Sequence, residues 1–195
     1  MYEERFDPYR ILDVVNSLDE NHFKSKNWLA EEVWEVWQKN SGIIHVAAGW
    51  YGLQAYLLQE KMPPEIKITS SDIDPECKTI GKVIFGNMEN TGKIKFEEQD
   101  TVLDIEKITR GVDIYVNTSI EHIERKYVEL MLSKIDSGKI VALQSNNWYN
   151  IPSHVNCSDS LEDFISYVKP HFKYIMYEGE MEFEEYNRYM IIGMK

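Results

Sequence analysis

The sequence predicts an α/β fold with an open, mostly parallel β-sheet and helices on both faces. Short apolar runs that suit buried strands alternate with helical stretches from residue 43 onward. Two β-prone runs, residues 172–181 and 186–194, follow and are joined by a short acidic turn, which is typical of an antiparallel hairpin. Five strands in βα units and two in the hairpin make a predicted sheet of seven strands.

The segment before the first strand is expected to be helical over residues 7–38, because its apolar residues recur at helical spacing. Asn27 is the expected N-cap within it. We expect the three tryptophans of this segment to pack against the sheet. The alternative is that they form an aromatic lid. We therefore expect an N-terminal helical extension over residues 1–40 and one further domain over residues 41–195.

The remaining elements follow from apolar runs and from the residues that interrupt them. Pro63 and Pro64 end the first helix of the alternating region, Pro75 begins the second, and Gly138 and Pro170 follow the third and fourth. Predicted strands cover residues 43–48, 66–71, 93–97, 112–117 and 139–144, and predicted helices cover residues 51–60, 75–84, 123–135 and 161–168.

Charge and cysteine content exclude several classes of protein. The chain of 195 residues has a formal net charge of −12 and no prominent Lys/Arg cluster, so tight nucleic-acid binding and membrane-surface binding are not expected. No apolar run is long enough to cross a bilayer and the first residues lack a signal-peptide core, so a cytoplasmic protein is expected. Cys77 and Cys157 are far apart, which argues against a disulfide framework or zinc site. A homo-oligomer is compatible with the sequence.

The region between the first two strands suggests a nucleoside site. Gly49 and Gly52 lie where the first strand turns into a helix, and glycine lets the backbone approach a ligand. Asp72 ends the second strand, twenty residues after Gly52. A carboxylate at the tip of that strand can accept hydrogen bonds from ribose hydroxyls.

This order of elements and motifs resembles the class I S-adenosylmethionine-dependent methyltransferases, over roughly residues 40–195. The resemblance implies a Rossmann-like sheet of seven strands with the last strand inserted antiparallel, and S-adenosylmethionine as the cofactor. It implies that the glycine loop holds the methionine half of the cofactor, Asp72 the ribose and Asp100 the adenine amine. The implied cofactor-binding positions are Gly49, Trp50, Gly52, Asp72, Ile73, Asp100, Thr101 and Asn117.

Catalytic candidates follow the fourth strand, where Asn117 matches the segment that faces the transferable methyl group in that family. His122 is the best candidate for a general base, since imidazole titrates near neutral pH, and Glu121 could orient it. The alternative is structural: His122 would be a polar residue in the first turn of a helix. Glu121 would then interact favourably with the dipole at the N-terminus of that helix, and Ser119 would be the N-cap of the helix.

Substrate-binding candidates follow the fifth strand. Amide side chains can hold a polar substrate through paired donors and acceptors, although Asn also favours turns. The candidates are Asn146, Asn147, Trp148 and Tyr149, with His154 and Asn156 as further possibilities. His45 lies inside a strand and is expected to be a core residue. No set of histidines and carboxylates has metal-ligand spacing, so no metal is expected.

The sequence therefore predicts a methyltransferase that acts on a small molecule or another acceptor of metabolite size. The segment from Asn117 to Ile120 lacks the Asn/Asp-Pro-Pro-aromatic motif of many nucleic-acid base methylases. Two other hypotheses remain: a non-catalytic module of the same fold that binds an adenosyl ligand or another protein, and a dehydrogenase that uses another nucleotide.

Overall fold

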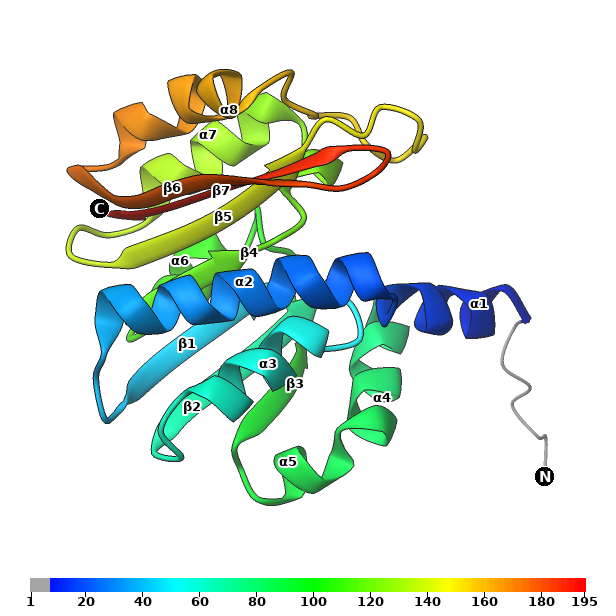
Figure 1. The fold of residues 1–195 in the computed structure, drawn as a ribbon. Helices are drawn as coiled ribbons and strands as arrows, with labels where there is room; N and C mark the ends of the chain where they lie inside the picture. The colour runs from blue at the N-terminus through cyan, green and yellow to red at the C-terminus, as the bar shows by residue number, and fades with distance from the viewer. Residues whose placement is uncertain (1–7) are drawn as a thin grey trace.

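The computed structural model describes residues 8–195 and contains a seven-stranded sheet with the strand order β3-β2-β1-β4-β5-β7-β6 (Figure 1). All neighbouring strands are parallel except β7, which is antiparallel to both β5 and β6. The fold class, the seven strands and the terminal hairpin predicted from the sequence are confirmed. The strands are β1 (Gly42–Ala47), β2 (Ile66–Asp72), β3 (Ile94–Glu98), β4 (Ile114–Asn117), β5 (Ile140–Asn146), β6 (Tyr174–Glu182) and β7 (Asn187–Met194).

Helices cover both faces of the sheet, and each face has its own apolar core. Residues of α2 and α3 pack with β1, β2 and β7 on one face, and residues of α6, α7 and α8 pack with β4, β5 and β7 on the other. The helices are α1 (Pro8–Ser17), α2 (Glu20–Trp37), α3 (Leu53–Lys61), α4 (Pro75–Ile84), α5 (Gly86–Asn90), α6 (Ile105–Thr109), α7 (Arg125–Lys134) and α8 (Leu161–Val168), with short 3-10 helices η1 (Ile120–His122) and η2 (Lys169–His171). None of these described helices is long and apolar enough to cross a membrane.

The N-terminal helical segment differs from its prediction at two points. It is broken at residues 18–19 into α1 and α2, and Asp19 caps α2 by accepting a hydrogen bond from the backbone N–H of His22. The expected N-cap, Asn27, instead lies inside α2, where its side chain binds Glu31 at the i+4 position. Residue 7, the predicted first helical residue, lies outside the described residues.

The tryptophans of α2 pack against the sheet, as the sequence favoured. Trp37 is buried in the core, and Trp28 and Trp34 are partly buried against it. The predicted helix over residues 123–135 begins only at Arg125, because η1 forms a separate turn directly after β4. The five-residue helices α5 and α6 were not predicted, since one turn has too few positions to show a helical period.

Candidate functional site

The strand order reverses beside β1, where β2 lies on one side and β4 on the other. In open α/β sheets such a switch point leaves a crevice at the carboxyl ends of the strands, and ligands bind there. Ala47, the last residue of β1, pairs with Asn117, the last residue of β4. The loops that follow β1 and β4 therefore form the two walls of this crevice.

The loop after β1 has an unusual backbone. Ala48 and Trp50 have φ values of 48° and 51°, and Gly52 has a φ of 98°. A Cβ on Gly49 would lie 2.3 Å from Ser70 Oγ, and one on Gly52 would lie 2.6 Å from the ring of Phe96. Both glycines are therefore required for packing of this loop against the neighbouring strands.

Asp72 lies at the carboxyl end of β2 and is held by two backbone amides. The N–H of Trp50 donates to Oδ2 (2.9 Å), and the N–H of Asp74 donates to Oδ1 (3.1 Å). The side chain is only half-buried. A carboxylate has about four lone-pair sites, so each oxygen keeps acceptor capacity for a ligand hydroxyl.

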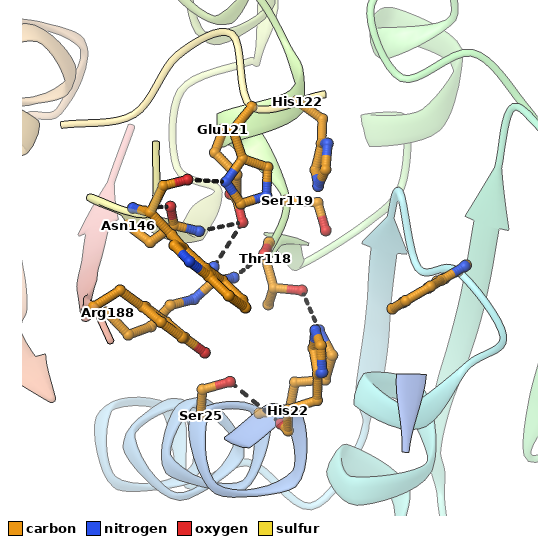
Figure 2. A pocket seen from close by; sticks show the side chains of 13 residues that line it. His22, Ser25, Thr118, Ser119, Glu121, His122, Asn146 and Arg188 are labelled. Atoms are coloured by element: carbon orange, nitrogen blue, oxygen red, sulfur yellow. Dashed lines mark hydrogen bonds and ion pairs between the residues drawn. The ribbon is translucent and has the colours of Figure 1, made fainter. Parts of the chain in front are cut away.

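A pocket that Trp50 helps to line opens at the carboxyl ends of β4 and β5 (Figure 2). Residues of α2, the β1 and β4 loops, the β5 end with its following loop, and β7 with the turn before it all contribute side chains. The lining residues are His22, Ser25, Lys26, Trp50, Thr118, Ser119, Glu121, His122, Asn146, Trp148, His154, Tyr186 and Arg188.

A buried ion pair between Glu121 and Arg188 lies at the back of the pocket. Arg188 Nη1 is 2.6 Å from Glu121 Oε1, and the amide of Asn146 donates to the same oxygen (2.8 Å) (Figure 2). Arg188 also donates to the carbonyl oxygen of Thr118. Burial is the largest single effect and acts to raise the pKa of Glu121, but the attraction of Arg188, together with the nearby His122 and hydrogen bonds, holds this pKa below its usual value.

Lys26 brings a second buried cation to the pocket. Its Nζ donates to Thr118 Oγ1 (3.0 Å), and no carboxylate among the described residues forms an ion pair with it. Burial, followed by the like charge of Arg188, lowers the pKa of Lys26 to about 7. A buried ammonium is costly for folding, so its presence at a pocket marks a functional candidate.

Two histidines lie at the mouth of the pocket. The rings of His122 and His154 meet edge to face with their centroids 4.6 Å apart. Their elements are held together by the backbone, because the carbonyl oxygen of Glu121 accepts the N–H groups of Val155 and Asn156. The loop after β5 therefore folds back onto η1.

Comparison with known proteins gives a likeness in structure alone. No family model matches the chain, and no curated protein matches its sequence. Among solved structures, the CurJ carbon methyltransferase has a TM-score of 0.69 at 8% identity over 94% of this chain. The pyocyanin biosynthetic protein PhzM has a TM-score of 0.66 at 9% identity over 88% of this chain. TrmK of M. capricolum, solved with S-adenosyl-homocysteine, has a TM-score of 0.60 at 15% identity over 88% of this chain and 67% of its own.

The chain has the class I methyltransferase fold. It spans just over half the length of the first two of these proteins, 58% of CurJ and 56% of PhzM. The resemblance predicted from the sequence is thus confirmed at the level of the fold.

In this methyltransferase fold, some of the residues expected to bind cofactor lie at the crevice or in the turn after β3, and others point into the protein. Asp72 lies at the crevice with Ile73, which is 65% exposed. Asp100 is half-buried, and its carboxylate accepts the N–H groups of Val102 and Leu103, so it closes the turn after β3.

Thr101 and Asn117 point into the protein instead. The hydroxyl of Thr101 binds that of Tyr115. Asn117 is fully buried, accepts the N–H of Ser119 and donates to Tyr115, and it is not among the residues that line the pocket. Asn117 therefore stabilises the conformation of the loop after β4.

The expected reacting and substrate-binding residues are brought together only in part. Glu121, His122, Asn146 and Trp148 line the pocket. Asn147 instead accepts the N–H of Asn187 at the start of β7. Tyr149 is 57% exposed and donates to Asp159, outside the pocket. Asn156 is buried between the carbonyl of Ile120 and the hydroxyl of Tyr167. Ser119 is the N-cap residue of η1, but its hydroxyl donates to the carbonyl oxygen of Ala48 and makes no capping hydrogen bond.

Sequence reasoning missed Lys26, Arg188 and Tyr186. Arg188 could have been found from the predicted hairpin. A strand that runs antiparallel to the rest of the sheet begins at the edge where the other strands end. Arg188 accordingly pairs with Asn146, the last residue of β5. Lys26 had no local signal, since α2 crosses the pocket only in the folded chain.

Proposed function

We propose that this protein is an S-adenosylmethionine-dependent methyltransferase whose acceptor is a small polar molecule. The observation that carries the proposal is the position of Trp50, whose backbone N–H binds Asp72 and whose ring lines the pocket. The same residue thus contacts the carboxylate of the proposed adenosyl site and a pocket rich in polar groups, so the two sites are neighbours. This is the arrangement that transfer between two ligands requires.

The donor set at the crevice fits the cofactor. Asp72 keeps acceptor capacity for two ribose hydroxyls. Ile73 and Leu103 are exposed apolar side chains on the loops that follow β2 and β3, and they can cover the two faces of an adenine ring. The loop over residues 48–52 would hold the methionine half.

The acceptor side of the site has the groups that a polar substrate needs. S-adenosylmethionine, when bound, supplies an electrophilic methyl group on a sulfonium. Glu121 neutralises Arg188, so Lys26 in its protonated form gives the pocket an excess positive charge that can bind an anionic group of the acceptor. His122 Nδ1 is 3.2 Å from the carbonyl oxygen of Ser153, which can only accept a hydrogen bond, so the free lone pair is on Nε2. His122 can then receive the proton that the acceptor loses as it gains the methyl group.

Calorimetric titration with S-adenosylhomocysteine tests the cofactor site. We expect one molecule to bind per chain, and Asp72→Asn to weaken binding about 10- to 100-fold, the loss of a hydrogen bond to a charged group. Asp113→Asn is the matched control, because Asp113 also accepts a backbone N–H, that of Ile43, but at the opposite edge of the sheet. No binding by the wild type, or equal losses in both variants, would contradict the proposal.

Turnover separates an enzyme from a binding module of the same fold. The full chain is incubated with S-adenosylmethionine and an extract of small metabolites, and formation of S-adenosylhomocysteine is followed. His122→Ala is expected to lower this rate while leaving S-adenosylhomocysteine affinity near that of the wild type. Binding without any cofactor consumption would favour the non-catalytic module.

A further inference from the structure

Three potential metal ligands meet in the pocket, one buried and two nearer its mouth. Glu121, His122 and His154 each offer a ligand atom, and these atoms lie within 4.8 Å of one another. Two come from η1 and one from the loop after β5, so the cluster exists only because that loop folds back onto η1. Two imidazoles and one carboxylate form a common ligand set for first-row transition metals.

The histidine side chains are already oriented as metal ligands usually are. His154 Nδ1 lies 2.8 Å from the carbonyl oxygen of Trp148, and His122 Nδ1 lies 3.2 Å from that of Ser153. Carbonyl oxygens only accept hydrogen bonds, so both Nδ1 atoms carry hydrogen and both Nε2 atoms have a free lone pair. A metal-binding histidine typically donates its other N–H to a carbonyl or carboxylate in this way.

Glu121 supplies an unused oxygen in the same place. Its Oε1 accepts from Arg188 and Asn146, whereas Oε2 is buried and has no hydrogen-bond partner among the described residues. The side chain is only 5% exposed, so this oxygen cannot rely on bulk water. A buried carboxylate oxygen without a partner is costly, and a cation would satisfy it.

We propose that Glu121, His122 and His154 bind one divalent transition-metal ion of the Zn²⁺ type, through Oε2 and the two Nε2 atoms. Imidazole nitrogen favours such ions over Mg²⁺ and Ca²⁺, which prefer oxygen ligands. Three protein ligands leave at least one coordination position for a ligand from the pocket. The proposal replaces the expectation, drawn from sequence spacing, that the chain has no metal site.

Cys157 is near the cluster but does not belong to the ligand set. Its Sγ lies 3.8 Å from His154 Nδ1, the nitrogen that faces the Trp148 carbonyl, and 3.5 Å from Asn146 Oδ1. The free lone pair of His154 is on the other nitrogen of the ring. Cys157→Ser is therefore a suitable control.

The metal site goes beyond the proposed methyl transfer and does not depend on it. With an ion bound, the Nε2 lone pair of His122 is no longer available as a base. The ion could then hold an oxygen of the acceptor and lower its pKa, which would remove the need for a protein base.

Zn²⁺ titration of the full chain, stripped of metal with a chelator, tests the site by calorimetry. Co²⁺ absorption serves as a second readout of coordination. We expect one ion per chain, with affinity reduced at least tenfold in both His154→Ala and His122→Ala. His171→Ala removes a histidine outside the pocket, and it and Cys157→Ser are expected to keep the wild-type affinity.

Four outcomes would overturn the metal site: no bound ion, several weak ions only, unchanged affinity in both pocket-histidine variants, or lost affinity in Cys157→Ser. His122 is exposed, so its variant keeps the test decisive if His154→Ala fails to fold. S-adenosylhomocysteine titration of the same samples separates the two proposals. Cofactor binding without Zn²⁺ binding contradicts the metal site alone, and Zn²⁺ binding without cofactor binding contradicts the methyltransferase alone.

Discussion

His45 shows how one side chain in the sheet sets a dependence of stability on pH. It is buried in β1, and its Nε2 lies 2.8 Å from Ser71 Oγ on β2, so it is the core residue that the sequence predicted. Burial lowers the pKa of His45 from 6.5 to about 4. Between these two pH values, His45 therefore binds a proton in the unfolded chain but not in the folded chain.

We expect the contribution of His45 to the free energy of unfolding to be fully present above about pH 6.5 and to be lost as the pH falls toward 4. The shift corresponds to about 3 kcal/mol. Urea unfolding of wild type and His45→Gln across this range measures it, because glutamine cannot titrate. The pH-dependent part is expected to be smaller in His45→Gln by that amount, and parallel curves would contradict this account.

Gly52 shows that a glycine in a proposed ligand-binding loop can be required for packing. Gly52→Ala combines a positive φ of 98° with a Cβ placed 2.6 Å from Phe96. We expect a loss of about 2–4 kcal/mol of folding free energy, measured by denaturant unfolding.

Gly138→Ala is the matched control for Gly52→Ala. Gly138 has a φ of 83°, but no atom lies within 4 Å of the added Cβ, so a loss of only about 1 kcal/mol is expected. Equal losses in the two variants would mean that backbone conformation, rather than the contact with Phe96, makes glycine necessary at position 52.

Helix α1 is attached to the rest of the protein by Arg10, by Asp13, which accepts hydrogen bonds from Trp50 and Tyr51, and by Val14, which packs against a small apolar cluster. The guanidinium of Arg10 lies 2.8 Å from Asp74 and 2.6 Å from Glu76 at the start of α4, and it donates to the hydroxyl of Tyr51. The hydrogen bond to Tyr51, followed by the attraction of Asp74, raises the pKa of Arg10 above its already high value, so it stays charged. Several apolar residues of α1 are exposed, so polar contacts supply much of what holds this helix besides the packing of Val14.

We expect Arg10→Gln to loosen α1 while changing global stability by only about 1 kcal/mol, since the ion pairs are partly exposed. Hydrogen exchange would show faster exchange in α1 and unchanged exchange in β1 and β4. Lys24→Gln removes an exposed ion pair with Glu20 on α2 and serves as the control. If sheet exchange accelerates equally in Arg10→Gln, α1 is part of the cooperative core and this view is wrong.

Elements with strong local signals could be predicted from the sequence. The strand at 66–71, the helix at 75–84 and the helix at 161–168 are delimited by apolar runs, prolines and caps, and their observed bounds differ by at most one residue. The break before α2 was missed because Asp19 and Asn27 are both good N-caps, and only packing selects between them.

The candidate site was less predictable because it is assembled at the level of the whole molecule. Asp72, Glu121 and His122 follow strands and could be placed at the carboxyl edge of the sheet from their position in the chain. Lys26 and Arg188 come from α2 and β7, which reach the same edge from opposite ends of the sequence. His122 and His154 meet through backbone hydrogen bonds to Glu121, which no residue pattern encodes.

The position of β7 inside the sheet has a consequence for the order of assembly during synthesis. This strand lies between β5 and β6 in the sheet, yet it follows every other described element in the chain, and it carries Arg188 into the pocket. A nascent chain that has emerged through β6 still has a gap in its sheet and leaves Glu121 without its counter-ion. β7 must therefore be synthesised before the pocket has its full set of charged side chains and the sheet is closed.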